Sequence, residues 1–150
     1  MKTKVIMTLI TVGLIAFVLI VSLTGTPSSE DKFHSSIDDV VFEEGVVNIY
    51  YFWQEGCPHC DAQFEFLEKI ADEWGAYFNV YSFEVASNRY NARLLNEVAG
   101  VLDVHVGGIP FTIIGEQTFT GFTERMEDDF INAIRYGRNH DFDSFRDLVE

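Results

Sequence analysis

The stretch VVNIYYFWQEGCPHC, residues 46–60, contains the only two cysteines of the chain, Cys57 and Cys60. Its first half, residues 46–53, is rich in β-branched and aromatic residues, which predicts a buried strand. After the cysteines, apolar residues recur at helical spacing, and charged residues take the solvent side. The apolar positions are Phe64, Leu67, Ala71 and Trp74, and the charged ones are Asp61, Glu65, Glu68, Lys69 and Asp72. The cysteines are therefore predicted to open a helix that follows a buried strand.

The start of a helix favours a thiolate over a thiol, because unpaired backbone N–H groups and the helix dipole place positive charge there. Cys57, at the very end, benefits most from this position. Pro58 fits the first helical turn, where its missing N–H costs no hydrogen bond. His59 adds a second positive charge near the Cys57 sulfur when it is protonated. Cys57 and Cys60 are close enough in sequence to form a compact disulfide, and one can resolve a mixed disulfide made by the other.

The cysteine pair is less typical of a zinc site or of a purely structural disulfide. Structural zinc sites use four ligands, and this sequence offers no second Cys-x-x-Cys and no close Cys/His pair. A purely structural disulfide between Cys57 and Cys60 would close too short a loop to stabilise the fold by much. We therefore expect no metal and no cofactor, and we interpret Cys57–Cys60 as a redox-active disulfide.

The order of predicted elements over residues 33–138 resembles the thioredoxin superfamily. Trp53, four residues before Cys57, matches the tryptophan beneath the active site in that family. The segment GIPFT, residues 108–112, matches the loop whose proline is cis and faces the disulfide. Gly121 matches a glycine near the family's substrate groove. The resemblance implies an α/β, thioredoxin-like fold with a central mixed sheet of about four to five strands flanked by helices.

The resemblance also implies roles for these residues in thiol–disulfide exchange. Cys57 would be the attacking thiolate and Cys60 the resolving thiol, with His59 tuning Cys57 and Pro58 completing the motif in the first helical turn. The substrate groove would lie over Trp53, Ile109 and Pro110, where an extended client segment pairs with the backbone beside the cis proline. The residues listed here are the predicted site: Cys57, Pro58, His59, Cys60, Trp53, Ile109 and Pro110.

Two departures from the family pattern bear on mechanism. The family carries a buried acid six residues before the first cysteine, and this chain has Tyr51 there. A tyrosine, with an ordinary pKa near 10, is a poor base, so water or Glu55 would take the Cys60 proton. The Cys-Pro-His-Cys motif resembles strong oxidases, whereas Ile109 resembles reducing thioredoxins. We favour an oxidase or isomerase over a reductase, because a charge beside the sulfur should shift the potential more than a neighbouring apolar side chain.

The N-terminus has the pattern of a membrane anchor. Two lysines precede residues 5–23, a run of nineteen residues without a charge, and no convincing cleavage site follows. We expect residues 1–26 to form a single transmembrane helix and residues 27–150 to form the domain on the extracytoplasmic side of the cell membrane. Secretion after signal cleavage is the alternative. A bacterial origin would fit the resemblance.

Charge excludes some partners. The chain has a net charge of −14, and its domain keeps eight basic against twenty-four acidic residues, which offers no electrostatic footprint for nucleic acid or anionic lipid. The expected partners are thiols or disulfides of exported proteins and a membrane redox partner. Two other classes stay open: a module that binds exported peptides without turnover, and a metal-delivery domain.

The remaining elements follow from periodicity and turn residues. The sequence predicts a brief helix over 33–41, a strand over 78–85, a helix over 88–99, a loop over 103–108, a strand over 118–122, a helix capped by Thr123 and ended by Gly137, and a docked helical tail over 142–149. His34, His105 and His140 are interpreted as surface or loop residues.

Overall fold

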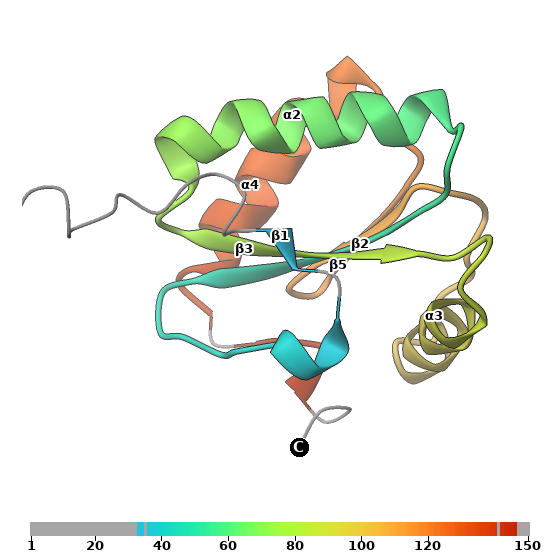
Figure 1. Cartoon of the computed structure of the whole chain (residues 1–150). Coiled ribbons are helices and arrows are strands. Elements are labelled where there is room, and N and C mark those ends of the chain that lie inside the picture. The colour runs from blue at the N-terminus through green and yellow to red at the C-terminus, as the bar shows by residue number, and fades with distance from the viewer. Residues whose placement is uncertain (1–32, 35, 141, 147–150) are drawn as a thin grey trace, which may run out of the picture.

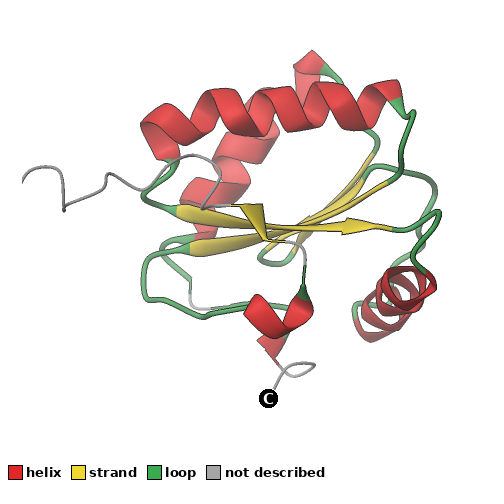
Figure 2. Cartoon of the chain, viewed as in Figure 1, coloured by secondary structure: helices red, strands yellow, loops and turns green. Residues whose placement is uncertain are grey.

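The computed structural model describes residues 33–34, 36–140 and 142–146, and in this part of the chain a single sheet is covered on both faces by helices (Figures 1 and 2). The strands are β1 (Phe33–His34), β2 (Val47–Trp53), β3 (Phe78–Glu84), β4 (Phe111–Ile114) and β5 (Gln117–Thr120). The helices are α2 (Pro58–Trp74), α3 (Arg89–Val101), α4 (Glu127–Gly137) and the short 3₁₀ turns η2 (Ile37–Asp39) and η3 (Glu124–Met126). The predicted mixed sheet flanked by helices is confirmed.

The sheet has the order β1-β3-β2-β4-β5, with β2 at its centre. β2 runs parallel to β3 and antiparallel to β4, and β5 pairs antiparallel with β4. Figure 1 shows α2 and α4 on one face of the sheet and α3, with the C-terminal tail, on the other. Because both faces are covered, β2 reads in sequence as a continuous apolar run and not as an alternating one.

Successive side chains of β2 enter two different cores, since a strand points its side chains alternately to opposite faces. Ile49 and Tyr51 join the core under α2 and α4. Tyr50 and Phe52 join the core on the α3 side, together with Phe145 of the C-terminal tail. All four of these β2 side chains are almost fully buried, so β2 contributes to both hydrophobic cores of the domain.

The buried face of α2 is displaced from the predicted one. Leu67 and Ala71 are buried as expected, but Phe64 is 37% exposed. Cys60 and Gln63 point inward, so the interface continues along the helix from them. An α-helix has 3.6 residues per turn, so a step of four residues rotates a side chain past one full turn. Because Cys60 points inward, Phe64 lies at the edge of the buried face of α2.

Two predictions about helices are wrong: the brief helix over 33–41 and the Thr123 cap of the last long helix. The region 33–41 contains a two-residue strand and a single 3₁₀ turn capped by Ser36 instead of a helix. Thr123 precedes the 3₁₀ turn η3 and makes no side-chain capping bond there, and α4 begins only after that turn, at Glu127.

Gly137 is the last residue of α4, as predicted, and a Cβ at this position would lie 3.0 Å from a Val47 side-chain carbon. Close packing on β2 therefore explains this glycine.

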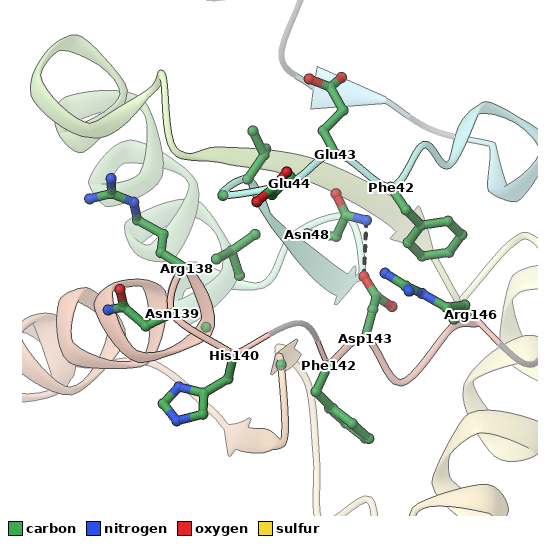
Figure 3. A pocket seen from close by; sticks show the side chains of 15 residues that line it. Phe42, Glu43, Glu44, Asn48, Arg138, Asn139, His140, Phe142, Asp143 and Arg146 are labelled. Atoms are coloured by element: carbon green, nitrogen blue, oxygen red, sulfur yellow. Dashed lines mark hydrogen bonds between the residues drawn. The ribbon is translucent and has the colours of Figure 1, made fainter.

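Residues 142–146 of the C-terminal tail dock on the domain, as predicted, whereas Leu148 and Val149 of the predicted helix lie outside the residues that the structure describes. Phe145 is fully buried and stacks on Tyr50 with ring centroids 3.6 Å apart. Asp143 accepts hydrogen bonds from the Tyr50 hydroxyl at 2.7 Å and from Asn48 Nδ2 at 2.9 Å. Figure 3 shows the Asn48–Asp143 bond at the wall of a cavity of about 480 Å³. Phe142, in contrast, is largely exposed.

The membrane segment predicted at residues 5–23 lies outside the residues described by the structure. Among the helices of residues 33–146 that are described, none is both long and apolar enough to span a bilayer.

Candidate active site

The cysteine pair sits where β2 ends and α2 begins, as the sequence predicted. Cys57 is the residue before the first helical turn, and Pro58 occupies the first helical position. The turn between strand and helix passes through Gly56 at φ +73°, a conformation that glycine adopts without steric cost. Cys57 and Cys60 are joined in a disulfide, with their Cα atoms 5.2 Å apart, within the range that disulfides require.

The two sulfurs have different surroundings. Cys57 is 8% exposed and Cys60 is 1% exposed. The backbone N–H of Cys60 donates to Cys57 Sγ at 3.2 Å, and the start of α2 lies directly behind this sulfur. These groups stabilise negative charge on the Cys57 sulfur once the disulfide is reduced. Cys57 is therefore the more exposed of the two sulfurs and the one better placed to carry negative charge.

A loop with a cis peptide bond lies against Cys57. The Ile109–Pro110 bond is cis, as predicted, and the Ile109 carbonyl oxygen lies 3.9 Å from Cys57 Sγ. The N–H of Gly121 donates to the Pro110 carbonyl at 2.7 Å and fixes the loop against the strand β5 region. The structure thus brings Cys57, Ile109 and Pro110 together.

His59 is exposed and turned toward a different partner. Its Nδ1 lies 3.0 Å from the Phe122 carbonyl oxygen. A carbonyl oxygen can only accept, so Nδ1 carries the hydrogen in this arrangement. The ring is held beside the segment that follows β5, and its described hydrogen bond goes there instead of to the Cys57 sulfur. Its tuning of Cys57 remains a prediction that would act through charge.

Tyr51 has a role that the sequence did not predict. Its hydroxyl donates to the Cys60 carbonyl oxygen at 2.8 Å, which links β2 to the first turn of α2. Burial raises the pKa of Tyr51 above its usual value, and the negative charge of Asp61 raises the pKa further. Tyr51 is therefore a fixed hydrogen-bond donor and not a base. The sequence signal for this hydrogen bond was a tyrosine on the inward side of the strand that precedes the cysteines.

A buried polar pair lies one turn beyond Cys60, and sequence reasoning also missed it. Gln63 is fully buried, and its Nε2 donates to Thr112 Oγ1 at 2.7 Å. Thr112 lies two residues after Pro110, so this bond ties the cysteine-bearing helix to the strand that follows the cis-proline loop. The signal was a glutamine at an inward position three residues after Cys60.

Trp53 is half-buried and lines a cavity of about 560 Å³ on the Cys60 side of the disulfide. Glu55, proposed from sequence as an acceptor of the Cys60 proton, is exposed and lies outside the lining of this cavity, whereas Asp61 lines it. The structure thus separates two of the predicted groove residues: Ile109 lies near the Cys57 sulfur and Trp53 near Cys60.

Among residues 33–34, 36–140 and 142–146, no group of three or more His, Cys, Asp or Glu side chains is placed to hold a metal ion. Outside the motif, His140 stacks on Tyr136 of α4, and His105 is exposed in the loop after α3.

Comparison with known proteins shows the fold. No protein-family model and no curated protein matches the sequence. The solution structure of an uncharacterised thioredoxin-like protein from Clostridium perfringens matches with a TM-score of 0.52 at 16% identity, over 70% of this chain and 79% of that one.

Two further solved structures are similar at a lower level. A thioredoxin from Malassezia sympodialis matches with a TM-score of 0.48 at 20% identity, over 69% of this chain and 87% of its own. A putative thiol:disulfide interchange protein DsbE from Chlorobium tepidum has a TM-score of 0.48 at 14% identity, over 63% and 82% of the two chains. Together with the cis-proline loop and the cysteine pair, the match to the Clostridium protein shows that this chain has a thioredoxin-like fold.

Proposed function

We propose that this protein is a thiol–disulfide oxidoreductase in which Cys57 exchanges with clients and Cys60 resolves. The observation that carries the proposal is the Cys57–Cys60 disulfide at the start of α2, with Cys57 Sγ facing the Ile109 carbonyl oxygen. A disulfide in this position combines an accessible sulfur, a stabilised thiolate and an adjacent backbone edge. The last of these gives an extended client segment a place to pair.

In the oxidising direction, a client thiolate attacks Cys57 Sγ and the Cys57–Cys60 bond breaks. Cys60 leaves as a thiolate and takes a proton, while Cys57 carries a mixed disulfide with the client. A second client thiolate then attacks the client sulfur of that bond, and Cys57 leaves. The client gains a disulfide, and the cysteine pair accepts two electrons. In the reducing direction the same steps run backwards, with the Cys57 thiolate attacking a client disulfide.

We favour the oxidising or isomerising direction. The N–H of Cys60, the helix start and a protonated His59 all stabilise the Cys57 thiolate, which stabilises the reduced pair and makes the disulfide more oxidising. A reductase of the same fold is the alternative, and Ile109 is the residue that supports it. Equilibration with glutathione separates the two: a potential near about −120 mV supports oxidation and one near about −270 mV supports reduction.

The proposed location follows from the sequence alone. Residues 5–23 would anchor the chain in the cell membrane and hold the domain on the extracytoplasmic side, near exported proteins and a membrane redox partner. Retention of the protein in membranes after an alkaline wash supports this arrangement. Release of a shortened form into the medium supports secretion after cleavage instead.

The function is tested by following disulfide formation in a reduced protein that contains two cysteines, with the full chain as catalyst. Wild type should accelerate the reaction, and Cys57→Ser should abolish the acceleration. A control is Asp128→Ala, which alters an exposed side chain on α4. Stoichiometric client binding that survives replacement of both cysteines by serine, with no exchange by wild type, would indicate a binding module and contradict the proposal.

A further inference from the structure

The cavity on the Cys60 side of the disulfide has an aromatic floor and an acidic rim. Tyr51 and Trp53 of β2 and Ser82 of β3 line it from the sheet, and residues of α2 line it from the helix. We call this cavity the acidic groove, and its lining residues are Tyr51, Trp53, Cys60, Asp61, Phe64, Glu65, Glu68 and Ser82. Its volume of about 560 Å³ lies in the size range of ligand sites.

The carboxylates of the groove stand along one edge of α2. Asp61, Glu65 and Glu68 follow each other at helical spacings of four and three, which puts them on one side of the helix. In the part of the chain that the structure describes, no ion pair joins these three carboxylates to a basic side chain. Lys69, the nearest lysine along the helix, pairs with Glu127 of α4 at 3.6 Å.

The groove and the cis-proline loop lie on different sides of the disulfide. Cys57 Sγ faces the Ile109 carbonyl, and neither residue lines the groove. Cys60 lines it, as does Trp53. A segment bound in the groove would therefore lie next to Cys60, while Cys57 and the cis-proline loop lie outside the groove lining.

We propose that the acidic groove binds a cationic segment of a protein client, one that combines lysine or arginine with an apolar or aromatic side chain. This inference rests on the proposed function, because protein clients are what bring such segments to the cysteines. The three carboxylates attract the cationic side chains, and the exposed part of Phe64 with half-buried Trp53 accepts the apolar one. The binding involves no covalent step.

The negative charge of the groove should favour cationic over anionic ligands, but the rest of the domain surface is also acidic. The domain carries eight basic against twenty-four acidic residues, so a general attraction for cations is present everywhere on its surface. What distinguishes the groove is that its unpaired carboxylates border an aromatic recess. The test must therefore separate binding in the groove from attraction to the whole surface.

The experiment uses the full chain in non-ionic detergent with Cys57 and Cys60 both replaced by serine, so that only non-covalent binding is measured. The probe is a cysteine-free peptide of lysine and serine with one tryptophan, and its glutamate counterpart is the second ligand. Calorimetry should show binding of the lysine peptide and none of the glutamate peptide. The combined variant Asp61→Asn, Glu65→Gln, Glu68→Gln should weaken binding at least about fivefold, the effect of roughly three partly exposed charge pairs.

The matched control is Asp103→Asn, Glu97→Gln, Glu116→Gln, which removes the same charge from exposed positions outside α2 and outside the groove lining. It should leave binding within about twofold of the parent, because salt at about 0.1 M screens the attraction between exposed charges that are not in contact. Equal weakening by both triple variants, or equal binding of both peptides, would overturn the proposal. Far-ultraviolet circular dichroism checks that each variant is folded.

A second readout locates the peptide. A photo-reactive phenylalanine analogue in place of the tryptophan should cross-link to the α2 segment that contains Phe64, and cross-linking only to other segments would overturn the proposal. The outcome is separable from the proposed function: glutathione exchange by wild type with no peptide binding would reject the groove alone. Peptide binding without exchange would reject the redox function alone.

Discussion

Tyr50 and Tyr51 are neighbours in β2, yet they serve opposite faces of the sheet and have different partners. Tyr51 faces the cysteines and donates to a neutral acceptor, the Cys60 carbonyl oxygen. Tyr50 faces the C-terminal tail and donates to the carboxylate of Asp143. The buried carboxyl that thioredoxin-like proteins place beneath their cysteines is replaced here by a phenol, while a largely buried carboxyl sits across the sheet.

This difference assigns separate tasks to the two faces. On the tail face, Asp143 accepts hydrogen bonds from the Tyr50 hydroxyl, the Phe145 backbone N–H and the Asn48 amide, the last of which Figure 3 shows, and these bonds fasten the tail to β2. On the cysteine face, Tyr51 positions the start of α2 without offering a base. Stability should therefore depend most on the tail face, and exchange kinetics on the cysteine face.

The largest expected effect is on the tail face. Asp143→Ala leaves the Tyr50 hydroxyl and the Asn48 amide without their shared acceptor in a buried setting. We expect a loss of about 2 to 4 kcal/mol in the free energy of unfolding, measured by urea denaturation. Asp128→Ala, at an exposed position of α4, is the control. A loss below about 0.5 kcal/mol for Asp143→Ala would break the distinction between the faces.

The pH dependence of the same variant sharpens the comparison. Burial raises the pKa of Asp143 above its usual value, against hydrogen bonds that lower it. A raised carboxyl pKa means that the folded state binds the proton more tightly, so the contribution of Asp143 is fully present below the unfolded pKa of 3.8 and declines as pH rises through the folded value. The stability difference between wild type and Asp143→Ala should be larger near about pH 3.5 than near about pH 7. A difference that grows toward neutral pH would contradict the assignment.

On the cysteine face, Tyr51→Phe should cost only about 1 kcal/mol, the net worth of one hydrogen bond to the Cys60 carbonyl. Because Tyr51 is not a base, the rate at which Cys60 resolves a mixed disulfide with glutathione should keep its pH profile, measured by stopped-flow fluorescence. Tyr50→Phe is the matched variant on the other face. A change of about tenfold or more in the Tyr51→Phe resolution rate near neutral pH would mean that the phenol takes part in proton transfer.

The smallest expected effect concerns His59. Its charge acts on Cys57 from an exposed position, with Nδ1 held by the Phe122 carbonyl. His59→Ala should slow alkylation of reduced Cys57 by roughly two- to fivefold, as exposed charge pairs are worth about 1 kcal/mol or less. His140→Ala, three residues after the end of α4, should have no effect. Equal rates for wild type and His59→Ala would remove His59 from the list of tuning residues.

The sequence was informative where one local pattern determines one local structure. The run before Cys57 and the cysteine spacing predicted the strand and the helix start, and the resemblance of residues 108–112 to the thioredoxin superfamily predicted the cis bond; the structure contains all three. The strand and the helix start depend on short-range chemistry: β-branched and aromatic residues for the strand, and proline for the helix start.

Features set by tertiary partners were not predictable in the same way. The acceptor of Tyr51, the Gln63–Thr112 bond and the tail carboxylate Asp143 each join segments far apart in sequence. A period-based reading also placed Phe64 in the core, because helical spacing fixes which residues share a face but not where the edge of that face falls. The acidic groove depends on that displacement, so it could not be predicted either.

The central claim, that Cys57 attacks and Cys60 resolves, is tested most directly by trapping. The full chain carrying Cys60→Ser, and separately Cys57→Ser, is incubated with a client protein that holds one reactive disulfide, and adducts are identified by mass spectrometry. The account predicts a stable mixed disulfide on Cys57 in the Cys60→Ser variant and little adduct in the Cys57→Ser variant, since Cys60 is 1% exposed. Preferential adduct formation at Cys60 would contradict it.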